Sequence, residues 1–162
     1  HSNGYSLVRK IIEINCLDIF SKTEFDKNKT LAETLMMPTL LYTKAFLTAN
    51  KNHKVKSISH ITGGGLIDNP PRVFNKNLTL KFDMKNFKLP PIFQWLKDKA
   101  NISLFELAKT FNCGIGLLIF VDKKDAQTII NDVNKVGYNA FLIGSMIENN
   151  SNRNVTFDGW NL

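Results

Sequence analysis

The feature that most limits the folds open to this chain is a run of six residues, 116–121, without a polar side chain. A strand with one face in water alternates apolar and polar residues, so an unbroken apolar run is typical of a strand covered on both faces. The next segment has apolar residues at the spacing of a helix that packs on a sheet: Ala126, Ile129, Ile130 and Val133. Together the two segments predict a sheet buried between helices.

Apolar spacing and turn signals place the other elements. The predicted strands cover residues 55–61, 78–82, 138–147 and 155–157. The predicted helices cover 7–17, 30–37 and 40–49, and three more begin at Pro90 and Pro91, after Ser103 and after Asp122. Two prolines within 69–72 predict a rigid turn there.

Capping motifs support several of these helix starts. Thr30 with Glu33, and Ser103 with Glu106, form capping boxes, in which a hydroxyl and a carboxylate satisfy free amides of the first turn. Asp122 is a candidate cap for the last helix. Ser2, Asn3 and Ser6 are available to cap the first helix.

The order of these elements predicts the fold class. Strands alternate with helices but not in strict βαβ order, which favours an α+β fold with a mixed β-sheet flanked by helices in an α/β/α layered arrangement. At 162 residues the chain is expected to form a single domain with one sizeable core.

Composition argues against several classes of protein. The formal net charge of +7 is spread over scattered lysines, and only Arg9, Arg72 and Arg153 are arginines, so no nucleic-acid surface is expected. The longest apolar run is far short of the roughly 20 residues that span a bilayer. Two cysteines are too few for a disulfide framework, which fits a reducing cytoplasm.

The strongest functional signal is a predicted strand that ends in His60 and Ile61 and runs into Thr62, Gly63, Gly64 and Gly65. Without side chains, glycine amides can converge on an anion, and the Thr62 hydroxyl can add a donor. The alternative is a plain tight turn. The position of His60 beside the glycines makes it a functional candidate.

A second candidate lies a few residues later, in Asp68, Asn69 and Arg72. The two intervening prolines fix the chain direction, which would aim the Arg72 guanidinium at a phosphate or a carboxylate. The alternative is a surface salt bridge between Arg72 and either Asp68 or Asp83.

Two further segments place an asparagine beside a glycine at an element boundary. They are residues 2–6 with Arg9, and residues 111–116, which include Asn112 and Gly114. Small residues there permit close approach of a ligand, or they serve as structural caps and turns. Cys113 is expected to be a buried apolar thiol rather than a nucleophile.

In this order the segments resemble the C-terminal domain of the phosphoribosylformylglycinamidine cyclo-ligases, the aminoimidazole ribonucleotide synthetases of purine biosynthesis. The matching stretches are 1–9 (HSNGYSLVR), 35–39 (LMMPT) with Tyr42 and Lys44, 60–66 (HITGGGL), Asn69 with Pro71 and Arg72, 90–96 (PPIFQWL), 111–116 (FNCGIG) and Ile143 with Gly144. The chain departs from the usual pattern at Asp68 for Glu, Ser57 for Gly and Phe87 for Trp.

The resemblance implies an enzyme that uses MgATP to activate the formyl or amide oxygen of formylglycinamidine ribonucleotide as a phosphate ester, after which an internal nitrogen closes the imidazole ring. It implies that this chain is the C-terminal half of a two-domain homodimeric cytoplasmic enzyme, whose N-terminal domain supplies dimer contacts and most of the ATP and Mg²⁺ site and is absent here. The implied catalytic residue is His60, and this chain is expected to supply no metal ligand. The implied substrate-binding residues are Thr62, Gly63, Gly64, Gly65, Asn69 and Arg72, and less directly Asn3, Ser6, Arg9, Asn112 and Gly114.

Two other functions remain open at this point. Formylglycinamidine ribonucleotide synthetase, selenophosphate synthetase, thiamine-monophosphate kinase and a hydrogenase-maturation protein share the fold resemblance and ATP-dependent phosphoryl transfer. A stand-alone, non-catalytic nucleotide-binding module is the alternative from a different class. We expect this chain alone to show no turnover, because it lacks an evident acidic cluster for magnesium.

Overall fold

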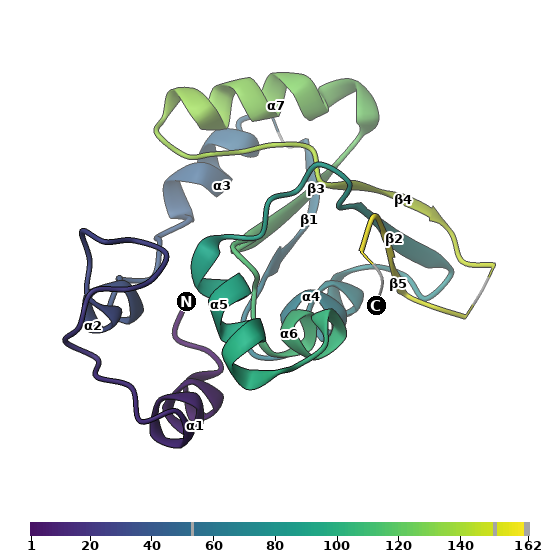
Figure 1. Ribbon diagram of the computed structural model, residues 1–162. Coiled ribbons are helices and arrows are strands. Elements are labelled where there is room, and N and C mark those ends of the chain that lie inside the picture. Colours follow the sequence, from purple (N-terminus) through teal and green to yellow (C-terminus); the bar gives the residue numbers. More distant parts are fainter. Residues whose placement is uncertain (53, 151, 161–162) are drawn as a thin grey trace.

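The computed structural model describes residues 1–52, 54–150 and 152–160 (Figure 1). The helices are α1 (Tyr5–Ile14), α2 (Leu31–Leu35), α3 (Thr43–Ala49), α4 (Gly65–Asp68), the 3₁₀ helix η1 (Pro70–Val73), α5 (Pro91–Ala100), α6 (Leu104–Thr110) and α7 (Lys123–Lys135). The strands are β1 (Val55–His60), β2 (Leu78–Asp83), β3 (Leu117–Val121), β4 (Gly144–Glu148) and β5 (Val155–Asp158). None of the helices within the described ranges is long and apolar enough to cross a membrane.

The strands form two sheets. β1 pairs antiparallel with β3, with a register shift between Val55 and Ser57. In the second sheet β2 lies in the centre, antiparallel to β4 and parallel to β5. The α+β class and the mixed sheet are confirmed, whereas the division of the strands into two sheets was not predicted from the sequence.

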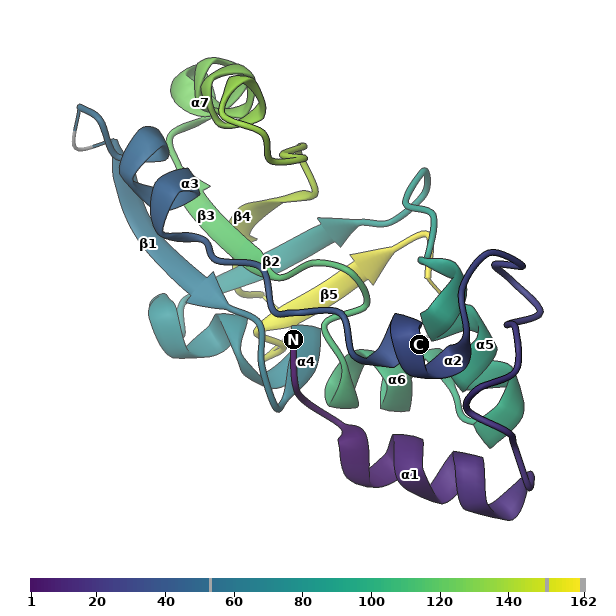
Figure 2. The same cartoon turned by 90° about the vertical axis from the view of Figure 1, so that its left-hand side faces the viewer.

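The β1–β3 sheet is covered on both faces, as the apolar run 116–121 predicts. Ile119 and Val121 pack against a cluster formed by α3 and α7, whose buried members are Ala45, Ala49, Ile129 and Val133. Leu118 and Phe120 point to the opposite face and join the main core. Both views place α3 and α7 on one side of this sheet and α4 and α6 on the other (Figures 1 and 2).

The main core connects the two sheets to the remaining helices. Its fully buried members include Ile61, Leu66, Phe82 and Leu107. Along one edge the rings of Phe82, Phe157 and Trp160 stack on one another, with interplanar angles of 14° and 6°. Ile61 precedes the loop after β1 and Leu66 belongs to α4, so their burial anchors both the loop and the helix in the main core.

Both predicted capping boxes are present: Thr30 and Ser103 each accept from the backbone of the glutamate three residues on. The predicted side-chain cap of the first helix is wrong. Gly4 is the N-cap residue, with φ 77°, and neither Ser2, Asn3 nor Ser6 caps the helix, because Gly4 turns the chain while it packs against the Phe111 ring.

Other caps and boundaries differ from prediction: the first helix spans residues 5–14 rather than 7–17, and the second spans 31–35 rather than 30–37. Asp122 is the N-cap residue of α7, but its side chain does not cap the helix and instead pairs with Lys56 Nζ at 3.1 Å. The helix expected over 40–49 begins only at Thr43. The strand expected over 138–147 begins only at Gly144, because the Asn134 side chain bonds both backbone groups of Ala140 and holds a turn after α7.

Candidate functional site

The glycine-rich loop connects the end of β1 to α4, and its shape requires glycine. Gly64 has φ 103°, and a Cβ there would lie 3.0 Å from Asp68 Cβ and 3.1 Å from Asn69 Nδ2. The Gly65 amide donates to the carbonyl of Thr62 at 3.0 Å, which closes the turn. Any larger residue at position 64 would be strained and crowded.

Asn69 fixes this loop from inside the protein. Its side-chain oxygen accepts from the Thr62 amide at 2.6 Å, and its side-chain nitrogen donates to the Gly63 carbonyl at 2.9 Å. Asn69 is only 4% exposed. With both ends of its amide engaged, this side chain holds the loop in its observed conformation.

The backbone amides left for a ligand are those of Gly63 and Gly64. Thr62 and Gly65 already donate within the loop, whereas the amides of Gly63 and Gly64 donate to no acceptor within the described ranges. Gly63 is exposed, so its N–H group is accessible to solvent. This arrangement can bind an anionic oxygen.

The Arg72 guanidinium lies close to Gly64 of the loop. Arg72 Nη2 lies 3.5 Å from the point where a Gly64 Cβ would stand. The side chain is exposed, and in the described part of the chain it forms no ion pair with Asp68 or Asp83. The salt bridge considered as the alternative from the sequence is therefore not formed.

Asn3 approaches the loop from the N-terminal segment. Its side-chain nitrogen lies 3.6 Å from the point where a Gly63 Cβ would stand. Asn3 and Gly63, which are 60 positions apart in the sequence, are thus neighbours, and the Asn3 side chain adds a polar group next to the loop.

Next to the loop, three rings meet at the end of β1. The ring centroids of His1 and His60 are 4.7 Å apart, and those of Tyr42 and His60 are 5.7 Å apart. His60 itself is exposed. Gly116 lies directly behind the cluster, because a Cβ there would run into the Tyr42 hydroxyl and the His1 ring.

The hydrogen bonds of His1 define its protonation. Its Nδ1 lies 2.7 Å from the Ile61 carbonyl oxygen, which only accepts, so Nδ1 carries a proton. In the neutral ring Nε2 then accepts from the Tyr42 hydroxyl at 2.9 Å. Burial raises the pKa of Tyr42, with a smaller contribution from Tyr138, so Tyr42 remains a hydroxyl donor at neutral pH.

The remaining candidates from the sequence form no hydrogen bond with the loop among the described residues. Ser6 and Arg9 are on the exposed face of α1. Asn112 accepts from the Gly114 amide at 2.9 Å in a turn of its own, and Gly114 packs against Pro90. These contacts are the structural caps and turns that we weighed as the alternative for this segment.

Sequence reasoning missed two members of the ring cluster, His1 and Tyr42. They lie 59 and 18 positions before His60, and no spacing rule links them. Tyr42 was visible only as part of the stretch that carries the family resemblance.

The described residues contain no group of three His, Cys, Asp or Glu side chains that could hold a metal ion. Cys113 is fully buried, and burial raises the pKa of its thiol to about 12. It stays protonated at neutral pH, as expected for a structural thiol.

The chain matches the family described as "AIR synthase related protein, C-terminal domain" over residues 1–155. It belongs to this family. The loop, Asn69, Arg72 and the ring cluster therefore lie within the part of this AIR synthase related domain that the family shares.

Curated relatives of this AIR synthase related domain carry related names. It is 41% identical over 156 residues, 96% of its length, to the phosphoribosylformylglycinamidine cyclo-ligase of Neisseria gonorrhoeae. It is 40% identical over 151 residues to the bifunctional purine biosynthetic protein ADE1 of Schizosaccharomyces pombe, with 93% of its length matched. It is 44% identical over 147 residues to the trifunctional purine biosynthetic protein adenosine-3 of Gallus gallus, with 91% matched.

The domain spans only part of these relatives. It covers 45% of the Neisseria gonorrhoeae protein, 19% of the Schizosaccharomyces pombe protein and 15% of the Gallus gallus protein. The relatives therefore contain further chain segments beyond the one described here.

Proposed function

We propose that this chain is the C-terminal domain of a phosphoribosylformylglycinamidine cyclo-ligase, a cytoplasmic homodimeric enzyme that closes formylglycinamidine ribonucleotide to aminoimidazole ribonucleotide and releases ADP and phosphate. The observation that carries the proposal is the 41% identity to the Neisseria gonorrhoeae cyclo-ligase over 96% of the chain. An N-terminal domain of the same polypeptide is its partner.

The glycine loop has the task of binding an anionic part of the substrate. The Gly63 and Gly64 amides have no acceptor among the described residues and the Arg72 guanidinium lies close to Gly64, so together they can meet the charge of a phosphate or a developing phosphate ester. Asn69 is a positioning residue, since it fixes the two loop segments that carry these amides. Asn3 adds a polar contact at Gly63.

His60 has the task of moving a proton at the reacting oxygen or nitrogen. It is exposed next to the glycine loop, and its imidazole contacts the rings of His1 and Tyr42. An imidazole is suited to this role because its two ring nitrogens can accept and donate a proton.

Among the described residues no three carboxylate, imidazole or thiol groups come together, so no step of the reaction is assigned to a metal held here. ATP is a substrate whose transferred phosphoryl group the loop would face, and the N-terminal domain supplies the remaining contacts to ATP and Mg²⁺.

The experiment measures ADP release from MgATP and formylglycinamidine ribonucleotide, with this chain and with the complete reading frame that contains it. We expect turnover by the complete protein and none by the 162-residue chain. Turnover by this chain alone would overturn the need for a second domain. If neither protein releases ADP, the result would favour a superfamily relative with another phosphoryl acceptor, such as selenophosphate synthetase or thiamine-monophosphate kinase.

A substitution of Arg72 tests the site within the complete protein. Arg72→Ala is expected to weaken substrate binding by about 1.5–3 kcal/mol, because it removes a charged hydrogen-bond partner. Lys135→Ala removes an exposed positive charge on α7 and serves as the matched control. An unchanged Michaelis constant and turnover in Arg72→Ala would remove Arg72 from the site.

A further inference from the structure

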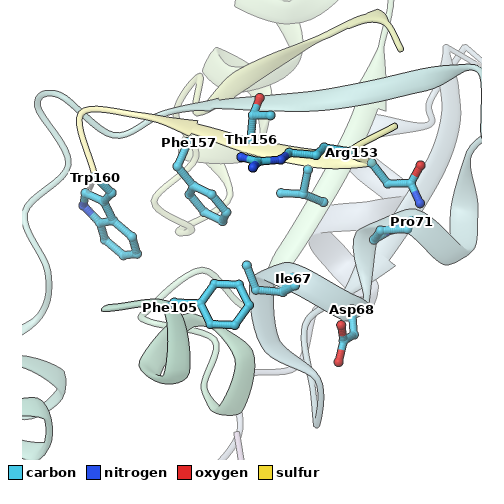
Figure 3. Close-up of a pocket in the computed structure, with 10 residues that line it drawn as sticks. Ile67, Asp68, Pro71, Phe105, Arg153, Thr156, Phe157 and Trp160 are labelled. Atoms are coloured by element: carbon cyan, nitrogen blue, oxygen red, sulfur yellow. The ribbon is translucent and has the colours of Figure 1, made fainter. Parts of the chain in front are cut away.

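A hollow lies between α4, η1 and α6 on one side and β5 with Trp160 on the other. It encloses about 700 Å³ (Figure 3). Its lining comes from three places that are distant in the sequence: Ile67, Asp68 and Pro71 of α4 and η1, Phe105 of α6, and residues 153–157 with Trp160. We call this hollow the β5 groove.

Aromatic rings form the walls of the β5 groove. Phe105 is 42% exposed, which is unusual for a phenylalanine on a helix that packs in the core. The rings of Phe157 and Trp160 stand opposite it and are stacked on each other, with centroids 5.9 Å apart and an interplanar angle of 6°. Phe157 is stacked on Phe82 as well as on Trp160, so a flat ring that enters the groove can stack on the exposed Phe105 ring, while the Phe157–Trp160 stack borders it on the other side.

A positive charge lies along the rim of the groove. Figure 3 shows the Arg153 side chain extended along β5 toward Phe157. Arg153 is exposed, and its guanidinium makes no ion pair with any residue in the described ranges. The one carboxylate in the lining, Asp68, lies at the opposite end from Trp160. The part of the groove beside the Arg153 guanidinium, away from Asp68, therefore favours an anionic group (Figure 3).

The edge of β5 adds backbone donors and acceptors. β5 is the outer strand of its sheet, and the carbonyls of Asn154 and Asp158 accept from the amides of Leu80 in β2 and of Met84, the residue after β2. Because neighbouring residues of a strand direct their backbone groups to opposite sides, those of Val155 and Phe157 face the open edge. A heterocycle seated beside them can form hydrogen bonds with its ring edge.

From these features we infer that the β5 groove binds a flat heteroaromatic ring that carries an anionic group, the chemical class of a nucleoside monophosphate. The ring lies between Phe105 and the Phe157–Trp160 stack, and Arg153 pairs with the phosphate. This site is separate from the glycine loop and goes beyond the proposed function. Only Asp68 borders both, through its contact with Gly64.

Adenosine 5′-monophosphate is the probe, and the readout is the indole N–H signal of each tryptophan in a proton–nitrogen correlation spectrum. The chain has two tryptophans, and Trp95 lies away from the groove beside Phe25, so its signal is an internal reference. A Trp95→Phe variant assigns the two signals. We expect the Trp160 signal to shift saturably with added nucleotide while the Trp95 signal stays in place.

Variants separate the two parts of the recognition. Arg153→Gln is expected to weaken binding at least about tenfold, the usual scale for a charge-assisted hydrogen bond, and to leave the affinity for adenosine unchanged. Phe105→Leu is expected to weaken both ligands. Lys135→Gln removes the same charge from α7 and is expected to leave binding as it was. Thermal melting of each variant checks that it is folded.

The contrary outcomes are equally distinct. If the Trp160 signal does not shift, or if inorganic phosphate alone shifts it as strongly, the groove does not recognise the ring. If Lys135→Gln weakens binding as much as Arg153→Gln, the net positive charge of the chain attracts the nucleotide, and Arg153 does not form a specific phosphate site. Arg72→Ala, which tests the glycine loop, is expected to leave this titration unchanged, so failure of one proposal is distinguishable from failure of the other.

Discussion

At the residue scale, the candidate site depends on a side chain whose role could not be deduced from its type. The sequence marked Asn69 as a ligand-binding candidate, and the structure places it behind the loop with both amide ends engaged. A spacing of seven residues between Thr62 and Asn69 does not show whether the side chain turns toward the loop or toward solvent. Only the turn at α4, which brings Asn69 under Gly63, decides this.

Asn69→Ala is expected to lower the free energy of unfolding by about 1–3 kcal/mol, because it leaves the partly buried Thr62 amide and the Gly63 carbonyl without their partners. Denaturant unfolding measures the change. Asn131→Ala, on the exposed face of α7, is the control and is expected to stay within about 0.5 kcal/mol. An unchanged stability in Asn69→Ala would mean that water replaces both hydrogen bonds and that Asn69 does not fix the loop.

Cys113 makes stability depend on pH in the alkaline range. Its pKa is about 12 in the folded chain, against about 8.5 for a free thiol, so above that lower value the unfolded chain loses a proton that the folded chain keeps. This contribution is fully present below about pH 8.5, and it falls by up to about 1.4 kcal/mol per pH unit as the pH rises toward 12.

Comparison of denaturant unfolding between the wild-type chain and Cys113→Ala at several alkaline pH values tests this dependence. The variant is expected to be less stable at neutral pH and to lose less stability as the pH rises. The exposed Cys16 is the internal control for access, since iodoacetamide is expected to alkylate Cys16 and to spare Cys113 in the folded chain. If the free energy of unfolding of the wild-type chain and of Cys113→Ala changed with pH in the same way, the raised pKa of Cys113 would not cause the alkaline loss of stability.

At the scale of elements, signals carried by a few consecutive residues predicted structure better than hydrophobic patterns that run over a longer segment. Both capping boxes were confirmed, because each is a contact among four consecutive residues that the sequence fully specifies. The strand expected over 138–147 was too long, because the turn held by Asn134 and Ala140 depends on how α7 ends. Hydrophobic periodicity does not report such side-chain contacts to the backbone.

The capping box of α6 is expected to support the main core. Ser103→Ala removes the bond to the Glu106 amide and should lower the free energy of unfolding by about 1 kcal/mol, since Leu107 and Ala108 of this helix are fully buried. Ser145→Ala, at an exposed position of β4, is the control. A loss as small as that of the control would show that packing alone holds the start of α6.

At the scale of the whole molecule, the sheet β1–β3 joins two separate clusters of buried side chains. Ile119 and Val121 face the α3–α7 cluster, while Leu118 and Phe120 face the main core. The sequence predicted this two-sided burial from one uninterrupted apolar run. It did not reveal that the strands divide into two sheets, because pairing partners are set by contacts between distant segments.

Because the two clusters share one sheet, we expect them to unfold together. Ile129→Ala removes a buried side chain from the α3–α7 cluster and should lower the free energy of unfolding by about 2–4 kcal/mol. Both tryptophans, Trp95 and Trp160, pack against the other cluster, so their fluorescence reports only the main core directly. The fluorescence midpoint in denaturant should nevertheless shift as far as the midpoint from far-ultraviolet circular dichroism.

Gln127→Ala, on the exposed face of α7, is the matched control. A fluorescence midpoint that stays at the wild-type value while the dichroism midpoint falls would show that the α3–α7 layer unfolds independently of the main core.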